Sequence, residues 1–327
     1  MDDEKNVEHH QTNTVLNDLL MRKAITANDE SLKKLLDSSC INLASGEDKE
    51  KYAQILPANI MKNLFTKCRE KRRDFESSLP HNHEEMIDTL FDDMTPFIFD
   101  VSNMKQYKRE PKLSESTYLQ AFSNALQAFL DDTRVILKAG ETVSGSTQRM
   151  QIINDGDTTY RRRIDILVAC DLETDNDDVE ICSIEIKKSN ITTATLQQQQ
   201  NKNLRINACI LNDIHLFTEN TDHQLIYFDF AGKSAYMVQL YRYENCFVAH
   251  KIGSFHLIDS LKEFAVNLSN TIALCYVDQA YKYELIEVSD YASTTPAGST
   301  KRKVDPVIVS LSPSNQSKRT KRIIDRY

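Results

Sequence analysis

The chain has 327 residues, of which 40% are hydrophobic, and a formal net charge of −8, so it is long enough for one large domain or two modest ones. No stretch reaches the apolar length of a membrane span, and the acidic, polar start Met1–Glu4 argues against a signal peptide. Seven scattered cysteines without a Cys-x-x-Cys pair argue against a disulfide framework or a zinc ribbon, and they predict a nuclear or cytoplasmic protein that is not secreted.

The first third of the chain has the spacing of amphipathic helices. Residues 1–13 are polar and predict a disordered segment. After them, apolar residues recur three and four positions apart, as Leu16, Leu19 and Leu20 do. We therefore expect an α-helical N-terminal region over residues 14–105.

Helical and extended patterns alternate from residue 113 onward. Helices are expected at 114–129, 195–212 and 257–276, and strands at 135–139, 149–153, 164–168, 184–187, 225–230, 235–241 and 247–255. The turn signal Asp155-Gly156 would join the strands on either side of it in a hairpin. This alternation predicts an α/β domain over residues 113–283, with a mixed central sheet flanked by helices.

Residues 290–327 form a basic tail whose composition predicts disorder. From Lys301 onward, eight Lys or Arg residues stand against two Asp residues. The clusters 301–303 and 318–322 are typical of a nuclear import signal, which would make an import receptor a partner. They can equally clamp nucleic acid or simply keep the tail soluble, and the sequence leaves these roles open.

Two short strands place charged side chains in otherwise apolar segments. Along residues 164–168 the isoleucines share one face and Asp165 lies on the other, while along 184–187 Glu185 and Lys187 share a face. If the strands pair, two carboxylates and an ammonium meet on one side of the sheet. Carboxylates hold Mg²⁺ or Mn²⁺, and a lysine beside them can act on a water or on phosphate charge. This set of residues favours phosphodiester hydrolysis.

Asp165, a gap of nineteen residues and then Glu185-Ile186-Lys187, set on strands between two helices, resembles the PD-(D/E)XK nuclease superfamily. That superfamily includes restriction endonucleases, RecB-type nucleases and Holliday-junction resolvases. The resemblance spans residues 113–245 and implies a restriction-endonuclease-like fold and a Mg²⁺-dependent nuclease. It also implies Asp165 and Glu185 as metal ligands, Lys187 as the catalytic lysine and Glu115 as an assisting acid. The superfamily motif has a proline before the aspartate. This chain has none before Asp165, and many members of the superfamily also lack it.

Residues near these strands are candidates for contacts with nucleic acid. Arg161, Arg162 and Arg163 can grip phosphates, or they form a solvated charge run beside an acidic loop. Gln199 resembles the glutamine of RecB-like members, although the run of four glutamines leaves its register open. Arg205 can line a groove near the site or belong to a polar helix face.

Other interpretations stay open beside the nuclease. Residues 200–207 with 226–229 also resemble multi-copy fungal proteins of unknown function. The charged strands can belong to a nuclease fold that has lost activity and binds nucleic acid or protein, or to a solvated hairpin edge with a surface ion pair. The N-terminal helices can serve a protein–protein adaptor. The resemblance favours DNA as substrate and leaves the oligomeric state open, a homodimer included.

Overall fold

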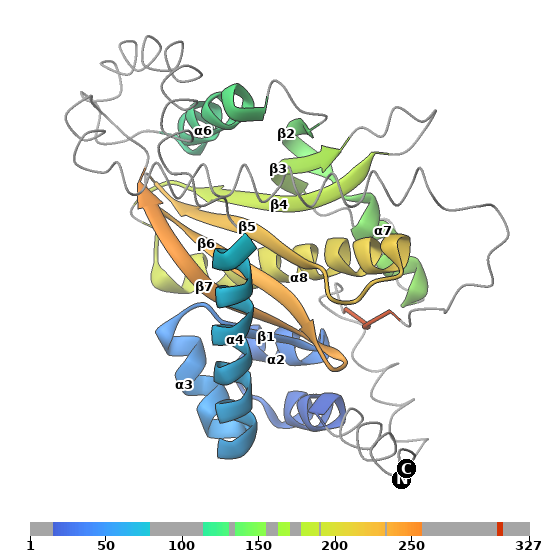
Figure 1. The fold of residues 1–327 in the computed structure, drawn as a ribbon. Helices are drawn as coiled ribbons and strands as arrows, with labels where there is room; N and C mark the ends of the chain where they lie inside the picture. Colours follow the sequence, from blue (N-terminus) through green and yellow to red (C-terminus); the bar gives the residue numbers. More distant parts are fainter. Residues whose placement is uncertain are drawn as a thin grey trace, which may run out of the picture.

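The computed structural model describes residues 16–78, 114–130, 135–154, 163–170, 178–189, 191–232, 234–256 and 306–309 (Figure 1). Residues 16–26 are helical, and the helices after them are α2 (Glu30–Asp37), α3 (Gly46–Ile55), α4 (Ala58–Ser78), α6 (Glu115–Leu130), α7 (Gly145–Ile153) and α8 (Thr193–Thr218). The strands are β1 (Cys40–Leu43), β2 (Val135–Val143), β3 (Arg163–Cys170), β4 (Val179–Lys187), β5 (Gln224–Ala231), β6 (Ser234–Tyr243) and β7 (Cys246–His256).

The segment 1–13, the helix predicted at 257–276 and most of the basic tail lie outside the described residues. In the part of the chain that is described, no helix combines the length and the apolar composition that a membrane crossing needs.

Within the described residues, seven strands form one mixed sheet in the order β1-β7-β6-β5-β4-β3-β2. β1 pairs with β7 and β4 pairs with β5 in parallel, while the other neighbours are antiparallel. Parallel neighbours cannot be joined by a tight turn, so the chain crosses from β4 to β5 through the long helix α8. The α/β class and the mixed sheet flanked by helices are confirmed.

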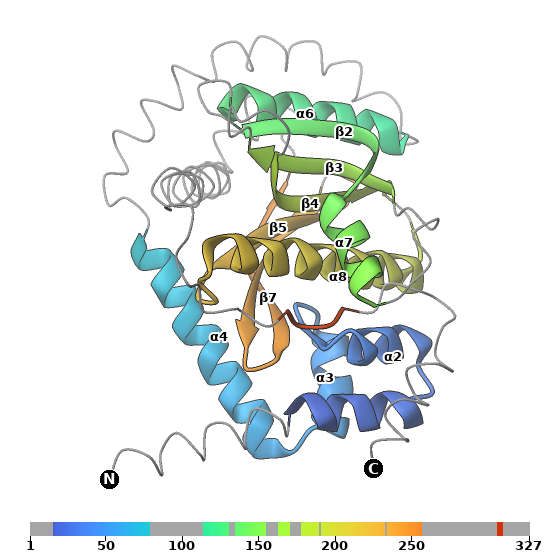
Figure 2. The same ribbon diagram turned by 90° about the vertical axis from the view of Figure 1, so that its right-hand side faces the viewer.

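Helices cover both faces of the sheet (Figure 2). Side chains alternate along β5, so Phe228 and Phe230 lie on one face and Asp229 lies on the other. On the first face, the α6 residue Phe122 packs against both rings, with centroids 6.1 and 4.3 Å away. On the second face, Asn203 of α8 donates a hydrogen bond to Asp229. The result is a three-layer arrangement in which α8 lies directly over β4 and β5.

The hairpin predicted between strands 149–153 and 164–168 is wrong, because the first segment belongs to helix α7. Ser144 caps this helix by accepting a hydrogen bond from the Thr147 N–H, and the Glu180 carboxylate accepts from Gly145 N at 2.6 Å. An N-cap serine and an acidic group at the positive end of a helix both stabilise it. β2 takes the place beside β3 instead.

The N-terminal region is less purely helical than expected, because β1 lies within it. β1 is fully buried and extends the sheet beside β7, with Cys40 opposite Phe247. The helices around β1 then share a hydrophobic cluster with β6 and β7, in which Tyr52 and Tyr241 are buried. In front of the sheet in Figure 1, α4 crosses β6, where the Gln239 side chain donates to the Lys71 carbonyl at 3.2 Å.

Residues 306–309, within the predicted tail, lie against α7 and α8. The Asn212 side chain pairs with the backbone of Val307 through two hydrogen bonds of 2.6 and 3.1 Å. Asn154 donates to the Val309 carbonyl at 2.8 Å, and both valines are buried. An asparagine side chain presents a donor and an acceptor side by side, so it can pair with an extended backbone as a neighbouring strand would.

We expect Asn212→Ala to lower the free energy of unfolding by about 1–3 kcal/mol, because it leaves the buried Val307 N–H and carbonyl without these partners. Urea unfolding measures the loss, and amide hydrogen exchange at Val307 should accelerate. Asn220→Ala, at an exposed position, is the matched control and should change both quantities little. Unchanged exchange at Val307 would contradict the docking of this segment.

Candidate active site

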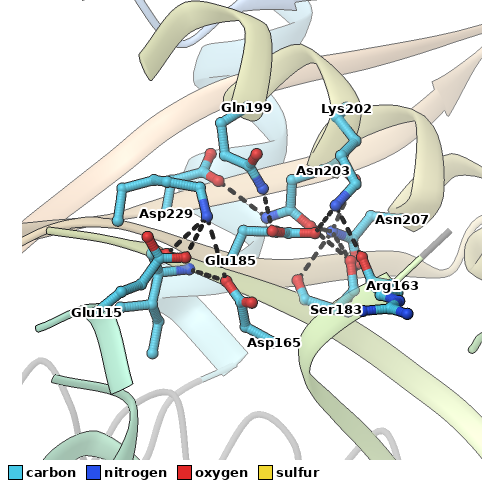
Figure 3. A network of polar contacts seen from close by, with 12 residues as sticks. Glu115, Arg163, Asp165, Ser183, Glu185, Gln199, Lys202, Asn203, Asn207 and Asp229 are labelled. Atoms are coloured by element: carbon cyan, nitrogen blue, oxygen red, sulfur yellow. Dashed lines mark hydrogen bonds and ion pairs between the residues drawn. The ribbon is translucent and has the colours of Figure 1, made fainter. Parts of the chain in front are cut away.

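Asp165 and Glu185 face each other across β3 and β4. The antiparallel register pairs Ile166 with Ile184, and its continuation by one residue places Asp165 opposite Glu185. Directly opposed residues of an antiparallel pair point to the same face, with Cβ atoms about 5 Å apart. The two carboxylates therefore lie on one side of the sheet (Figure 3).

Asp165 is anchored by the backbone of the neighbouring strand. Its Oδ2 atom accepts a hydrogen bond from the Ile186 N–H at 2.8 Å. The same oxygen is 3.8 Å from the Lys187 ammonium. The Asp165 side chain is partly exposed, so this carboxylate lies at the solvent side of the site.

Glu185 is almost completely buried, with 2% of its surface exposed. Its Oε1 atom accepts from Lys202 Nζ at 2.7 Å, and its Oε2 atom accepts from the Gln199 amide. Burial raises the pKa of Glu185 to about 7; Lys202 opposes this shift and the nearby Asp165 adds to it. A carboxyl group that titrates near neutral pH can change its charge when its surroundings change.

Lys187 links the sheet to the start of α6. Its ammonium donates to Glu115 Oε1 at 2.5 Å and to the Ile186 carbonyl at 3.1 Å. Burial lowers the pKa of Lys187, but Glu115 and Asp165 outweigh that effect and the pKa is raised overall. Lys187 is therefore a cation at neutral pH in this arrangement, suited to neutralising charge more than to accepting a proton.

The structure thus brings together the four residues predicted as catalytic, Glu115, Asp165, Glu185 and Lys187. They come from α6, β3 and β4, three elements that are separated in the sequence. Their polar contacts continue into the first turns of α8, the helix that carries the predicted candidates Gln199 and Arg205 (Figure 3).

Two charged residues of the site were missed from the sequence. Asp229 lies on β5 in register with Glu185 and is 3% exposed. Lys202 of α8 reaches Glu185 and also donates to the Arg163 carbonyl at 2.7 Å. Asp229 could have been found from the sequence, because it is the one charged residue within the apolar run 225–230. For Lys202, helical periodicity places it about one turn after Gln199 and hence near the same face of α8.

A ladder of uncharged polar groups supports Asp229 beneath α8. Asn203 donates to Asp229 Oδ1 at 2.9 Å and accepts from the Ser183 hydroxyl at 2.5 Å. The Asn207 side chain accepts from Ser183 N and donates to its carbonyl. Burial raises the pKa of Asp229 to about 8, the Asn203 hydrogen bond opposes this and the Glu185 charge adds to it. The Asp229 carboxyl therefore holds its proton to a higher pH than an exposed aspartate does.

The residues predicted to contact nucleic acid lie in different places relative to the site. Arg161 and Arg162 lie outside the described residues, while Arg163 is exposed at the start of β3. Gln199 lies in the site, where its side-chain amide donates a hydrogen bond to Glu185. Arg205 is 5% exposed and its Nε donates to the Asn201 carbonyl, which argues against a contact with nucleic acid.

The donor set of the site suits a hard divalent cation. Among the described residues, no three His, Cys, Asp or Glu side chains are grouped closely enough to hold a metal between them. Asp165 and Glu185 nevertheless offer oxygen atoms from opposite positions of paired strands, and Mg²⁺ needs few protein ligands because it keeps several waters. The two carboxylates predicted as ligands are therefore of the type that Mg²⁺ and Mn²⁺ bind and lie on one face of the sheet, while both Glu185 oxygens accept hydrogen bonds from Lys202 and Gln199 in this structure.

Comparisons with family models, with curated proteins and with solved structures find no match to this chain.

The raised pKa of Asp229 predicts a dependence of stability on pH. From the ordinary value of 3.8 up to about 8, the folded protein keeps a proton that the unfolded chain releases. The stabilising contribution is complete below pH 3.8 and is lost as the pH rises to 8. Asp229→Asn keeps an acceptor for Asn203 and cannot ionise. The free energy of unfolding of this variant, relative to that of the wild type, should therefore increase from pH 3.8 to about pH 8 and stay constant at higher pH.

Urea unfolding at pH 5, 6.5, 8 and 9 measures this difference. The exposed Asp222→Asn variant is the control and should show no such trend. A constant difference between Asp229→Asn and the wild type at all four pH values would mean that Asp229 ionises normally.

Proposed function

We propose that the protein is a divalent-metal-dependent nuclease that hydrolyses phosphodiester bonds in nucleic acid, with DNA favoured, and that it has the restriction-endonuclease-like fold of the PD-(D/E)XK superfamily. The main support is the cross-strand placement of Asp165 opposite Glu185, with Lys187 3.8 Å from Asp165. The order α6, β2, α7, β3, β4, α8, β5 and the mixed sheet between helices are consistent with the resemblance that the sequence carries.

Each residue has a role that follows from its position. Asp165 and Glu185 would hold Mg²⁺ or Mn²⁺, which when bound activates a water and neutralises charge on the phosphate. Lys187, a cation in this structure, would stabilise the negative charge that develops on the phosphoryl oxygens. Glu115 accepts a hydrogen bond from the Lys187 ammonium and would thereby hold it near Asp165.

An inactive nuclease fold that binds nucleic acid or protein is the alternative. One observation favours it: both oxygens of Glu185 already accept hydrogen bonds, from Lys202 and from Gln199. A site adapted to binding alone would keep these contacts and would not need a metal. This alternative predicts an affinity for nucleic acid that falls with salt, without any cleavage.

The basic clusters of the tail lie outside the described residues. Their role as a nuclear import signal or as a clamp on nucleic acid stays a prediction, and so does a homodimer.

We expect the purified protein to cleave plasmid DNA, and to cleave single strands or RNA to a lesser extent, in Mg²⁺ or Mn²⁺ and not in EDTA. Glu185→Gln and Lys187→Met should each lower the rate by at least about 10²-fold, because each removes a charge that acts on the transition state. Lys188→Met removes the neighbouring exposed charge and is the control.

Cleavage by the wild type that persists in both Glu185→Ala and Lys187→Ala would contradict the site. Salt-sensitive binding of DNA by the wild type without any cleavage in either metal would favour the inactive alternative.

A further inference from the structure

The Lys202 ammonium bridges the two strands that bear the candidate metal ligands. It is 2.7 Å from Glu185 Oε1 on β4 and 2.7 Å from the Arg163 carbonyl oxygen on β3. Both contacts are made from α8, across the polar face of the sheet (Figure 3). Two oxygen atoms of adjacent strands around one positive charge are the kind of surroundings that Mg²⁺ and Mn²⁺ prefer.

Glu185 needs this partner as long as no other cation is present. Its side chain is 1% exposed, whereas the Lys202 side chain is 26% exposed. A buried carboxylate without a counter-charge is costly, and the loss of one member of a buried pair is strongly destabilising. Gln199 satisfies the second oxygen but brings no charge.

A divalent cation at Glu185 would meet Lys202 at the same oxygen. The distance from Nζ to Oε1 is that of a direct charge-assisted hydrogen bond, which leaves no room for a cation between the two atoms. Two like charges a few ångströms apart in a partly buried site repel each other. The partly exposed Lys202 side chain can withdraw toward solvent, whereas the Glu185 carboxylate is held inside.

We propose that Lys202 is the internal counter-ion of the cation site: its ammonium holds Glu185 while no divalent cation is bound, and it has to leave Oε1 when one binds. This inference rests on the proposed function, since it takes Asp165 and Glu185 as the metal ligands. Lys202 thereby sets the concentration of cation at which the site fills, and it keeps the buried carboxylate compatible with folding below that concentration.

The test is the affinity for Mn²⁺ alone, measured by calorimetry at pH 8 on the full chain. Lys202→Met keeps the aliphatic stem and removes the competing charge, so it should bind Mn²⁺ about tenfold more tightly than the wild type. Lys202→Arg keeps the charge and should not show this gain. Lys188→Met removes an exposed charge next to Lys187 and should leave the affinity within about twofold of the wild type.

Thermal unfolding gives a second readout that does not depend on activity. In EDTA, Lys202→Met should melt below the wild type, because Glu185 has lost its counter-ion. Saturating Mn²⁺ should raise its melting temperature more than that of the wild type. If Lys202→Met does not fold in EDTA, Lys202→Gln serves in its place, since its amide can still donate to Glu185.

Equal or weaker Mn²⁺ affinity in Lys202→Met and Lys202→Gln, with the wild type binding, would overturn the role of Lys202 and leave the metal site standing. Absence of Mn²⁺ binding in the folded wild type and in every variant would overturn the metal site itself and the proposed function with it.

Discussion

The burial of the Glu185 carboxylate is the constraint on which the rest of the site depends. A charge removed from water at the centre of a sheet has to be matched by another charge or by a proton. Here Lys202 supplies the charge, and a pKa raised to about 7 by burial brings the proton within reach. Because Lys202 comes from α8, the position of this helix over β4 determines the state of the carboxylate.

α8 is held in this position by polar contacts as well as by apolar packing. Asn203 and Asn207 connect the helix to Ser183 on β4, and Asn203 also connects it to Asp229 on β5. Hydrogen-bonding groups accept far fewer arrangements than apolar surfaces do, so a fully satisfied buried network specifies one register. The network therefore fixes the rotation of α8 that turns Gln199 and Lys202 toward Glu185.

The N-terminal region holds the same helix from its other side. The Asp48 carboxylate is buried and accepts from Gln197 at 2.6 Å, and Asn42 of β1 donates to Asn201 at 3.0 Å. Residue 197 lies two positions before Gln199, and residue 201 lies directly before Lys202, the two residues whose side chains bind Glu185. The region around β1 is thus joined to the site through α8, and a change there can reach Glu185 without any contact with it. At the far end of α8, Asn212 pairs with the docked segment around Val307.

The sequence by itself determined the chemical types and the local geometry of the site. Period-two alternation placed Asp165 on the face opposite its neighbouring isoleucines, and it placed Glu185 and Lys187 on one face. This holds because the side chains of a strand alternate in any fold. The helix that begins near Glu115 and the helix that contains Gln199 also followed from local patterns. The local pattern of residues 149–153 favours a strand, whereas the folded chain has helix α7 there, and the start of this helix is stabilised by Glu180, which lies far away in the chain.

Tertiary structure decided which of these residues meet. The register of β3 on β4, the parallel addition of β5 and the rotation of α8 bring Asp229 and Lys202 to Glu185, and none of these is a property of a short segment. Strand register depends on contacts between residues distant in sequence. The burial that raises the pKa of Glu185 exists only once the sheet and α8 have packed. The sequence could therefore name the carboxylates and the lysine of the site, while only the folded chain shows which charge balances Glu185.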